Sequence, residues 1–155
     1  QYINFLPKLL SIPLQGPGEE IDRDWETVKI GKANLLKKGS SKLIMLNFGS
    51  LLNHAKEIAK KYDMTLIDMR FIKPFDEGIL KKYSNAKWFI TIEDGSLIGG
   101  IGSTIANWVT EQNFRIQVKC FGIPDKFIEH MSREQMIKEA KLDYESITKE
   151  LDKIF

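Results

Sequence analysis

The chain has 155 residues, 43% of them hydrophobic, and its 23 Lys and Arg residues nearly balance 21 Asp and Glu residues. This size predicts one globular core, and the interspersed charges form neither a basic stripe for nucleic acid nor an acidic tail. No apolar run reaches the roughly 18 residues of a membrane helix, and no signal-peptide pattern is present. We therefore expect neither a nucleic-acid nor a membrane partner. The single cysteine, Cys120, excludes an internal disulfide and is predicted to be a buried structural thiol.

The sequence divides into a short arm and one domain. Residues 1–27 hold three prolines and then a run of charged residues, a composition typical of an arm or linker. Residues 28–155 contain periodic elements throughout. Because the sequence begins at Gln1, we expect a piece of a longer protein, in which the arm leads from a preceding domain.

Strands and helices alternate along residues 28–155. Short apolar runs predict strands at 28–36, 42–48, 64–69, 88–92 and 114–121, and helical spacing predicts helices at 51–61, 77–83, 104–112, 132–141 and 143–151. The expected helix N-caps are Ser50, Asp76, Ser103, Ser132 and Asp143. This order predicts a three-layer α/β/α fold with a mostly parallel sheet of about five strands. The first strand is expected to turn back through residues 39–41 onto the second, which gives one antiparallel edge strand.

The most informative stretch is residues 93–103, where a buried strand ends in acids and a glycine cluster opens a helix. The carboxyl ends of parallel strands are the usual place for ligands and partner surfaces. Gly99, Gly100 and Gly102 allow positive φ and close backbone approach, and a helix start presents unpaired N–H groups. The cluster is therefore a possible phosphate seat or a site of close packing, and spacing alone leaves both open.

Individual residues favour some kinds of site and argue against others. Two histidines and one cysteine without ligand spacing argue against a metal site, and no nucleophile elbow or first-strand dinucleotide fingerprint is present. Glu93 is a candidate acid or base, whereas Asp94 is expected to form a turn with Gly95. Arg70 follows a strand and could hold an anion or pair with Asp68 or Asp76. His130 is expected at the surface or in an interface.

Three segments read together resemble one family: residues 68–76 (DMRFIKPFD), 93–103 (EDGSLIGGIGS) and 122–130 (GIPDKFIEH). They are similar to the carboxyl-terminal domain of 1-deoxy-D-xylulose-5-phosphate synthases. The resemblance covers about residues 28–155 in unbroken order. It extends more distantly to the last domain of transketolases and of the thiamine-dependent component of 2-oxoacid dehydrogenases.

The resemblance implies a transferase that condenses pyruvate with glyceraldehyde 3-phosphate, with release of carbon dioxide, at the start of non-mevalonate isoprenoid synthesis. Such enzymes use thiamine diphosphate and magnesium. The Gly-Asp-Gly motif that holds them belongs to the first domain, and the glutamate that activates the cofactor belongs to the middle domain; both are absent here. We therefore expect no catalytic, cofactor-binding or metal-binding residue in this chain, and no activity from it alone. The implied compartment is the cytoplasm in a bacterium and a plastid-type organelle in a eukaryote.

In the family this domain packs on the other two domains and within a homodimer. The candidates for those contacts are Arg70, Glu93, Gly99, Gly100, Gly102, Ser103, Asp125 and His130. The chain departs from the family pattern at two places: residues 11–16 lack the Arg-Tyr-Pro-Arg-Gly stretch whose arginine is associated with substrate, and Met131 replaces a glycine. We therefore assign no substrate-binding residue to the arm. A stand-alone α/β binding or regulatory module remains the alternative of a different class.

Overall fold

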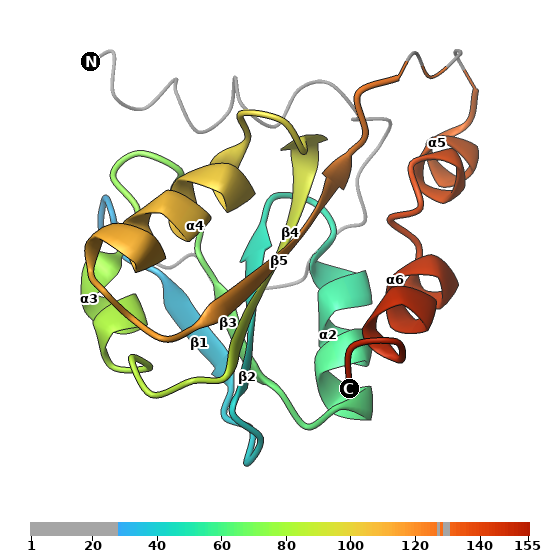
Figure 1. Cartoon of the computed structure of the whole chain (residues 1–155). Helices are drawn as coiled ribbons and strands as arrows, with labels where there is room; N and C mark the ends of the chain where they lie inside the picture. The colour runs from blue at the N-terminus through green and yellow to red at the C-terminus, as the bar shows by residue number, and fades with distance from the viewer. Residues whose placement is uncertain (1–27, 127, 129–130) are drawn as a thin grey trace.

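The computed structural model describes residues 28–126, 128 and 131–155, and its centre is a five-stranded sheet in the order β1-β3-β2-β4-β5 (Figure 1). The pairs β3–β2, β2–β4 and β4–β5 are parallel, whereas β1 pairs with β3 antiparallel. The expected mixed sheet with one antiparallel edge strand is therefore confirmed. The strands are β1 (Asn34–Lys37), β2 (Leu43–Phe48), β3 (Thr65–Asp68), β4 (Trp88–Ser96) and β5 (Gln117–Ile123).

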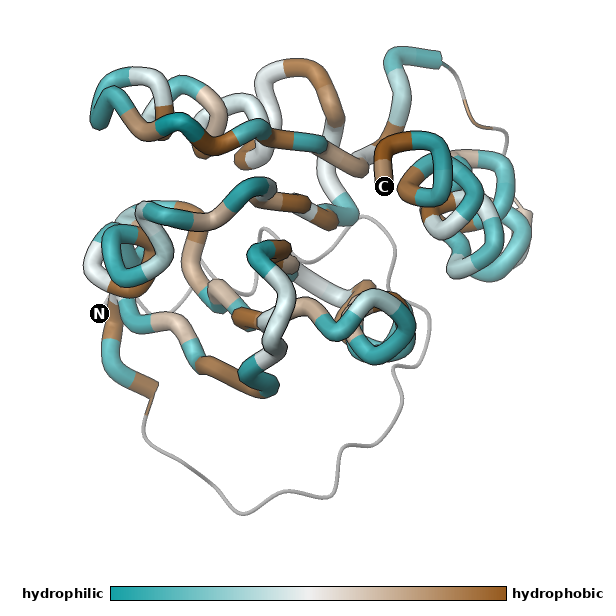
Figure 2. Tube along the Cα trace, turned by 60° about the horizontal axis from the view of Figure 1, so that its bottom comes forward, coloured by the Kyte–Doolittle hydropathy of each residue, from teal (hydrophilic) through white to brown (hydrophobic). Residues whose placement is uncertain are grey.

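Helices cover both faces of the sheet. One core cluster joins the sheet to α2, α5 and α6, and a second joins it to α3 and α4, so the fold has the three expected layers. In Figure 2 the hydrophobic segments gather on the strands, and hydrophilic residues lie along the outer sides of the helices, as burial of apolar area requires. The helices are α2 (Leu52–Lys61), α3 (Glu77–Lys81), α4 (Ile101–Glu111), α5 (Arg133–Glu139) and α6 (Tyr144–Leu151).

The first strand differs from its prediction in start and in partner. Residues 29–32 form a turn, with the Lys32 N–H donating to the Lys29 carbonyl at 3.1 Å, and the strand begins only at Asn34. It pairs with β3, so the predicted hairpin with β2 is wrong. The chain leaving β1 crosses the connection between α2 and β3, and at Gly39 the two backbones meet so closely that a Cβ would lie 2.1 Å from the Asp63 carbonyl oxygen. This crossing places β3 between β1 and β2.

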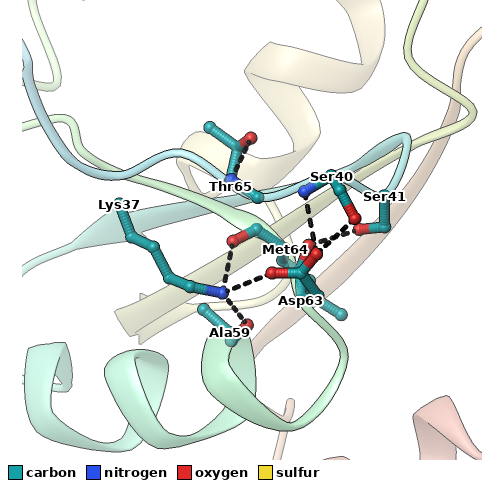
Figure 3. Close-up of polar contacts among 8 residues, drawn as sticks. Lys37, Ser40, Ser41, Ala59, Asp63, Met64 and Thr65 are labelled. Atoms are coloured by element: carbon teal, nitrogen blue, oxygen red, sulfur yellow. Dashed lines mark hydrogen bonds and ion pairs between the residues drawn. The ribbon is translucent and has the colours of Figure 1, made fainter.

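Asp63 holds that crossing together (Figure 3). Its backbone is left-handed, with φ of 48°, and its carboxylate accepts from the Ser40 N–H at 2.9 Å, from the Ser40 hydroxyl, and from Lys37 Nζ at 2.9 Å. The Ser40 hydroxyl, and after it the Lys37 ammonium, hold the pKa of this carboxyl well below its usual range. Lys37 Nζ also donates to the Ala59 carbonyl at the end of α2. The edge strand is therefore fastened to the helix layer by polar contacts.

Three of the five predicted helix caps are confirmed. Asp76 accepts from the Ile79 N–H at 3.2 Å, Ser132 forms a reciprocal capping box with Gln135, and Asp143 accepts from the Ser146 N–H at 3.0 Å. These caps are local devices, in which a side chain satisfies an N–H three residues ahead.

The other two predicted caps are wrong. α2 begins after Leu51 without a side-chain cap, so Ser50 lies outside it. α4 begins at Ile101, three residues earlier than expected, so Ser103 lies in its first turn and its hydroxyl donates to the Leu97 carbonyl at 3.2 Å. The cap position of α4 is Gly100, which has no side chain to offer.

β4 and β5 both end later than predicted, at Ser96 and Ile123. β4 continues to Ser96, so Asp94 and Gly95 belong to the strand and do not form the expected turn. After a register shift Ser96 is still paired with Ile123 of β5. Cys120 of β5 is half-buried and not fully buried as predicted, and this burial raises the pKa of its thiol.

Candidate functional site

A pocket of about 440 Å³ opens at the edge of the sheet where β2, β3 and β4 end and α4 begins. Its walls are the ends of β2 and β4, the loop that follows β3 and the loop before α4. This is the edge at which parallel α/β sheets usually bind ligands or partners. The lining residues are Phe48, Gly49, Arg70, Phe71, Ile72, Lys73, Glu93, Asp94, Gly95, Ser96, Ile98, Gly99, Gly100 and Ile101.

Glu93 lies at the floor of this pocket and caps α4. Its side chain comes from β4 and is only 4% exposed. Oε2 accepts from the Ile101 N–H at 3.0 Å and Oε1 from the Gly102 N–H at 2.9 Å. The carboxylate therefore satisfies two of the N–H groups that a helix start leaves unpaired. Burial raises the pKa of Glu93, the two N–H donors oppose that rise, and the charge of Asp94 adds to it.

Three glycines make room for the Glu93 side chain. A Cβ at Gly100 would lie 2.5 Å from Oε2 and 2.0 Å from the Ser96 carbonyl oxygen. A Cβ at Gly95 would lie 3.3 Å from Oε2, and one at Gly122 would lie 3.1 Å from the Glu93 Cγ. In the loop before α4, Gly99 uses the left-handed freedom of glycine, with φ of 70°. At Gly100 the requirement is for space.

Gly102 has a separate packing role. It lies in the first turn of α4, and a Cβ there would lie 2.7 Å from Thr91 Oγ1 and 2.8 Å from Cys120 Sγ. The helix start therefore sits directly on β4 and β5. This contact is the close-packing use of the glycine cluster that the sequence left open.

Asp94 also accepts a backbone hydrogen bond, from the segment that leads into α2 on the other face of the sheet. Its Oδ2 accepts from the Ser50 N–H at 2.9 Å, just before α2. Arg133 of α5 donates from Nη2 to the Ser50 hydroxyl at 2.8 Å, which joins the start of α5 to the same edge. The residue that sequence reasoning chose as a helix cap is thus the donor, and the acceptor is an acid 44 residues away.

Arg70 projects from the loop after β3, with a left-handed backbone at φ of 59°. Its Nε lies 3.9 Å from Asp68 Oδ2, the outer limit of an ion pair, and the side chain lines the pocket beside Lys73. Asp76 is not its partner, because that carboxylate accepts from the Ala33 N–H at 3.2 Å and from Lys32. Of the two predicted uses, pairing with Asp68 is present but loose, and Arg70 also lines the pocket.

The structure brings together Arg70, Glu93, Gly99 and Gly100 from the predicted contact residues, and all four line the pocket. Gly102 and Ser103 follow inside α4, Asp125 lies beyond the end of β5, and His130 lies outside the described residues. Sequence reasoning did not single out Ile72 and Ile98, which are 40% and 67% exposed at this pocket. For Ile98, the available sequence signal was its position in a loop directly before the glycine pair at 99 and 100.

The first N–H groups of α4 are not free to bind an external diphosphate. The two N–H groups at the start of α4 already donate to Glu93, and Glu93 and Asp94 add negative charge to the pocket wall. Glu93 is likewise engaged as an acceptor from two N–H groups, so it is not a free general base. Within residues 28–126, 128 and 131–155, no three His, Cys, Asp or Glu side chains gather in a way that could hold a metal ion. In the same part of the chain, none of the helices combines the length and apolar character needed to cross a bilayer.

Comparison with known proteins places this geometry in a family. The model of the transketolase C-terminal domain matches residues 31–147. The 1-deoxy-D-xylulose-5-phosphate synthases of Francisella tularensis subsp. novicida (strain U112) and subsp. tularensis (strain WY96-3418) are 42% and 41% identical to the chain over 142 residues. Those residues are 90% of this chain but 23% of each relative, so the chain spans about a quarter of their length.

A solved structure gives the same assignment. A split-gene transketolase, described as an inactive β4 tetramer, superimposes with a TM-score of 0.73 and 25% identity over 81% of this chain and 43% of its own. Fold and sequence thus agree over the described core. The chain belongs to the family of transketolase C-terminal domains.

Proposed function

We propose that this chain is the carboxyl-terminal domain of a 1-deoxy-D-xylulose-5-phosphate synthase, which condenses pyruvate with glyceraldehyde 3-phosphate and releases carbon dioxide. The observation that carries the proposal is the 42% identity to a synthase of that name over 90% of this chain. The split-gene transketolase shares the fold at 25% identity, which favours the synthase over a transketolase. The compartment proposed on the basis of the Francisella relatives is the bacterial cytoplasm.

The role proposed for the domain is to dock on the rest of the enzyme through its carboxyl edge. Ile72 and Ile98 are exposed apolar side chains at the mouth of the pocket, and exposed apolar groups of this kind are typical of protein contact surfaces. Arg70 and Lys73 add positive charge beside them. The neighbouring surfaces are those of the preceding domains and of the second subunit of a homodimer.

Thiamine diphosphate and magnesium are assigned to the part of the enzyme that precedes this domain. The occupied N–H groups at the start of α4 support this assignment, because a diphosphate would have to displace Glu93. When bound, the cofactor supplies the electron sink for decarboxylation and carbon–carbon bond formation. The contribution of this chain's own residues is to present a rigid surface. We therefore propose that the chain alone is inactive, a proposal supported by the description of the related split-gene protein as an inactive tetramer.

The test is a chimaeric enzyme. The matching carboxyl-terminal segment of the Francisella synthase is replaced by this chain, and release of carbon dioxide from pyruvate is measured with and without glyceraldehyde 3-phosphate. We expect activity that depends on both substrates, whereas the same synthase without the segment has none. A chimaera that is soluble, has the parent's oligomeric size and yet is inactive would contradict the proposal. The matched control is the same chimaera with Gly100→Ala, which is expected to lose activity because the pocket wall cannot form.

A further inference from the structure

The wall of the pocket between β4 and α4 depends on one buried carboxylate. Residues 96–100 connect the end of β4 to the first turn of α4, and Ile98 in that connection is 67% exposed. In the described structure, the side chain that binds the N–H groups of Ile101 and Gly102 is Glu93. Because Gly100 has no side chain, nothing at the cap position itself can replace it.

The geometry points to Glu93 as the positioning residue of the docking surface: its carboxylate fixes the start of α4 and thereby sets where residues 96–100 and Ile98 stand. This role rests on the proposed docking function, since it concerns the surface that meets the neighbouring domain. Glu93 itself is buried and touches no partner directly.

Glu93 can bind both N–H groups because its carboxylate has two acceptor oxygens. Each carboxylate oxygen takes one N–H, at 3.0 and 2.9 Å. A glutamine has one acceptor oxygen and one NH₂ donor group, so one of the two N–H groups would face a donor. A buried N–H without an acceptor is costly, and the connection can relieve it only by moving away. Gly95, Gly100 and Gly122 leave space for the native side chain but no groups that could substitute for it.

Charged and titratable groups near Glu93 come from three elements. Asp94 is its neighbour on β4, Cys120 lies on β5, and Arg70 and Lys73 line the same pocket from the loop after β3. Burial raises the pKa of Glu93, so it takes up a proton at higher pH than an exposed glutamate. The contribution of Glu93 to stability increases as pH falls, because its pKa is raised, whereas Asp63 and Asp76, whose pKa is lowered, lose their contributions in acid. The amides of α2 are therefore followed beside those of α4, so that a local change is distinguished from global unfolding.

The local test uses amide resonances of the full chain. In the wild type, the amide protons of Ile101 and Gly102 are expected to shift together as Glu93 titrates, at a pH above the usual glutamate range. Glu93→Gln is expected to abolish that titration and to speed hydrogen exchange of these two amides about tenfold or more, while amides of α2 are unchanged. The matched control is Glu111→Gln, which removes a carboxylate from the exposed opposite end of α4 and leaves both readouts as in the wild type.

The docking test uses the chimaeric synthase. Glu93→Gln is expected to lower its activity about tenfold or more, and Glu93→Asp, which keeps both oxygens one methylene shorter, to recover part of the loss. Equal activity of the Gln variant and its parent would overturn the positioning role. An inactive parent chimaera would instead refute the proposed function, and the amide titration would still decide the local contact. Amides of Ile101 and Gly102 that do not respond to pH in the folded wild type would also overturn the inference.

Discussion

Replacing each glycine of the cluster by alanine separates the need for space from the need for a left-handed backbone. Gly100→Ala would place a methyl carbon 2.0 Å from the Ser96 carbonyl oxygen and 2.5 Å from Glu93 Oε2. Gly102→Ala would place one 2.7 Å from Thr91 Oγ1. At Gly99 the methyl carbon would meet nothing within 4 Å, although its φ of 70° is unfavourable for alanine.

The three costs follow from these contacts. Overpacking a tight site typically costs about 1–3 kcal/mol, and the cost is highest where the obstacle is backbone, so we expect about 3 kcal/mol or more at Gly100. At Gly102 the obstacles are side-chain atoms, and alanine gains up to about 1 kcal/mol over glycine within a helix, which leaves a net cost of about 1–2 kcal/mol. Left-handed backbone alone costs alanine about 1–2 kcal/mol at Gly99.

The assay is urea unfolding of the full chain, followed by tryptophan fluorescence, with the free energy of unfolding extrapolated to zero denaturant. The expected result is that Gly100→Ala is the most destabilised of the three. A Gly100→Ala protein within about 0.5 kcal/mol of the wild type would refute the reasoning, because a contact of 2.0 Å with a backbone oxygen cannot be relieved by a side-chain rotation. So would a larger loss at Gly99 than at Gly100.

Two further predictions concern polar side-chain contacts between elements that are far apart in sequence. Asp76→Ala removes the acceptor for the N–H groups of Ile79 and Ala33, so we expect a loss of about 2–3 kcal/mol in unfolding free energy, measured by urea denaturation. Burial alone would raise the pKa of Asp76, but these N–H groups and the Lys32 ammonium lower it. The contribution of Asp76 to stability is therefore present above pH of about 4 and is lost as pH falls through the folded pKa. Asp76→Asn should therefore flatten the acid limb of the stability profile, and an unchanged limb would contradict this. Tyr62→Phe removes the hydroxyl that donates to Asp152 at 2.5 Å and should lower the unfolding free energy by about 1 kcal/mol; an unchanged urea midpoint would show that the bond contributes nothing.

Local signals predicted the elements whose stabilising partners are close in sequence. Asp76, Ser132 and Asp143 cap helices by accepting from N–H groups three residues ahead, and their residue types announce this. Ser50 and Ser103 carry the same signal and do not cap. At the start of α4 the acceptor is Glu93 of β4, and the Ser50 N–H before α2 donates to Asp94 of the same strand; no local cap pattern reveals either contact.

The strand order failed for a similar reason. A short turn after β1 favours a hairpin with the next strand, whereas the observed partner is β3, whose pairing depends on the crossing at Gly39 and Asp63. The end of β4 was predicted as a turn because Asp94 and Gly95 are common turn residues. The pairing of Ser96 with Ile123 keeps it in the sheet. The pocket lies at the edge that the sequence singled out, because the position of this edge depends only on where the parallel strands end.

The consecutive acids of β4 support the proposed contact role of this edge over anion binding. Neighbouring side chains on a strand point to opposite faces of the sheet, and here Glu93 serves the start of α4 on one face while Asp94 serves the chain before α2 on the other. The N–H groups that attract phosphates in other α/β folds therefore donate to the protein's own carboxylates. The pocket lining also exposes Ile72 and Ile98 and includes the basic residues Arg70 and Lys73. Covering this edge with another protein surface is favourable because it buries apolar area and leaves the hydrogen bonds of Glu93 and Asp94 in place.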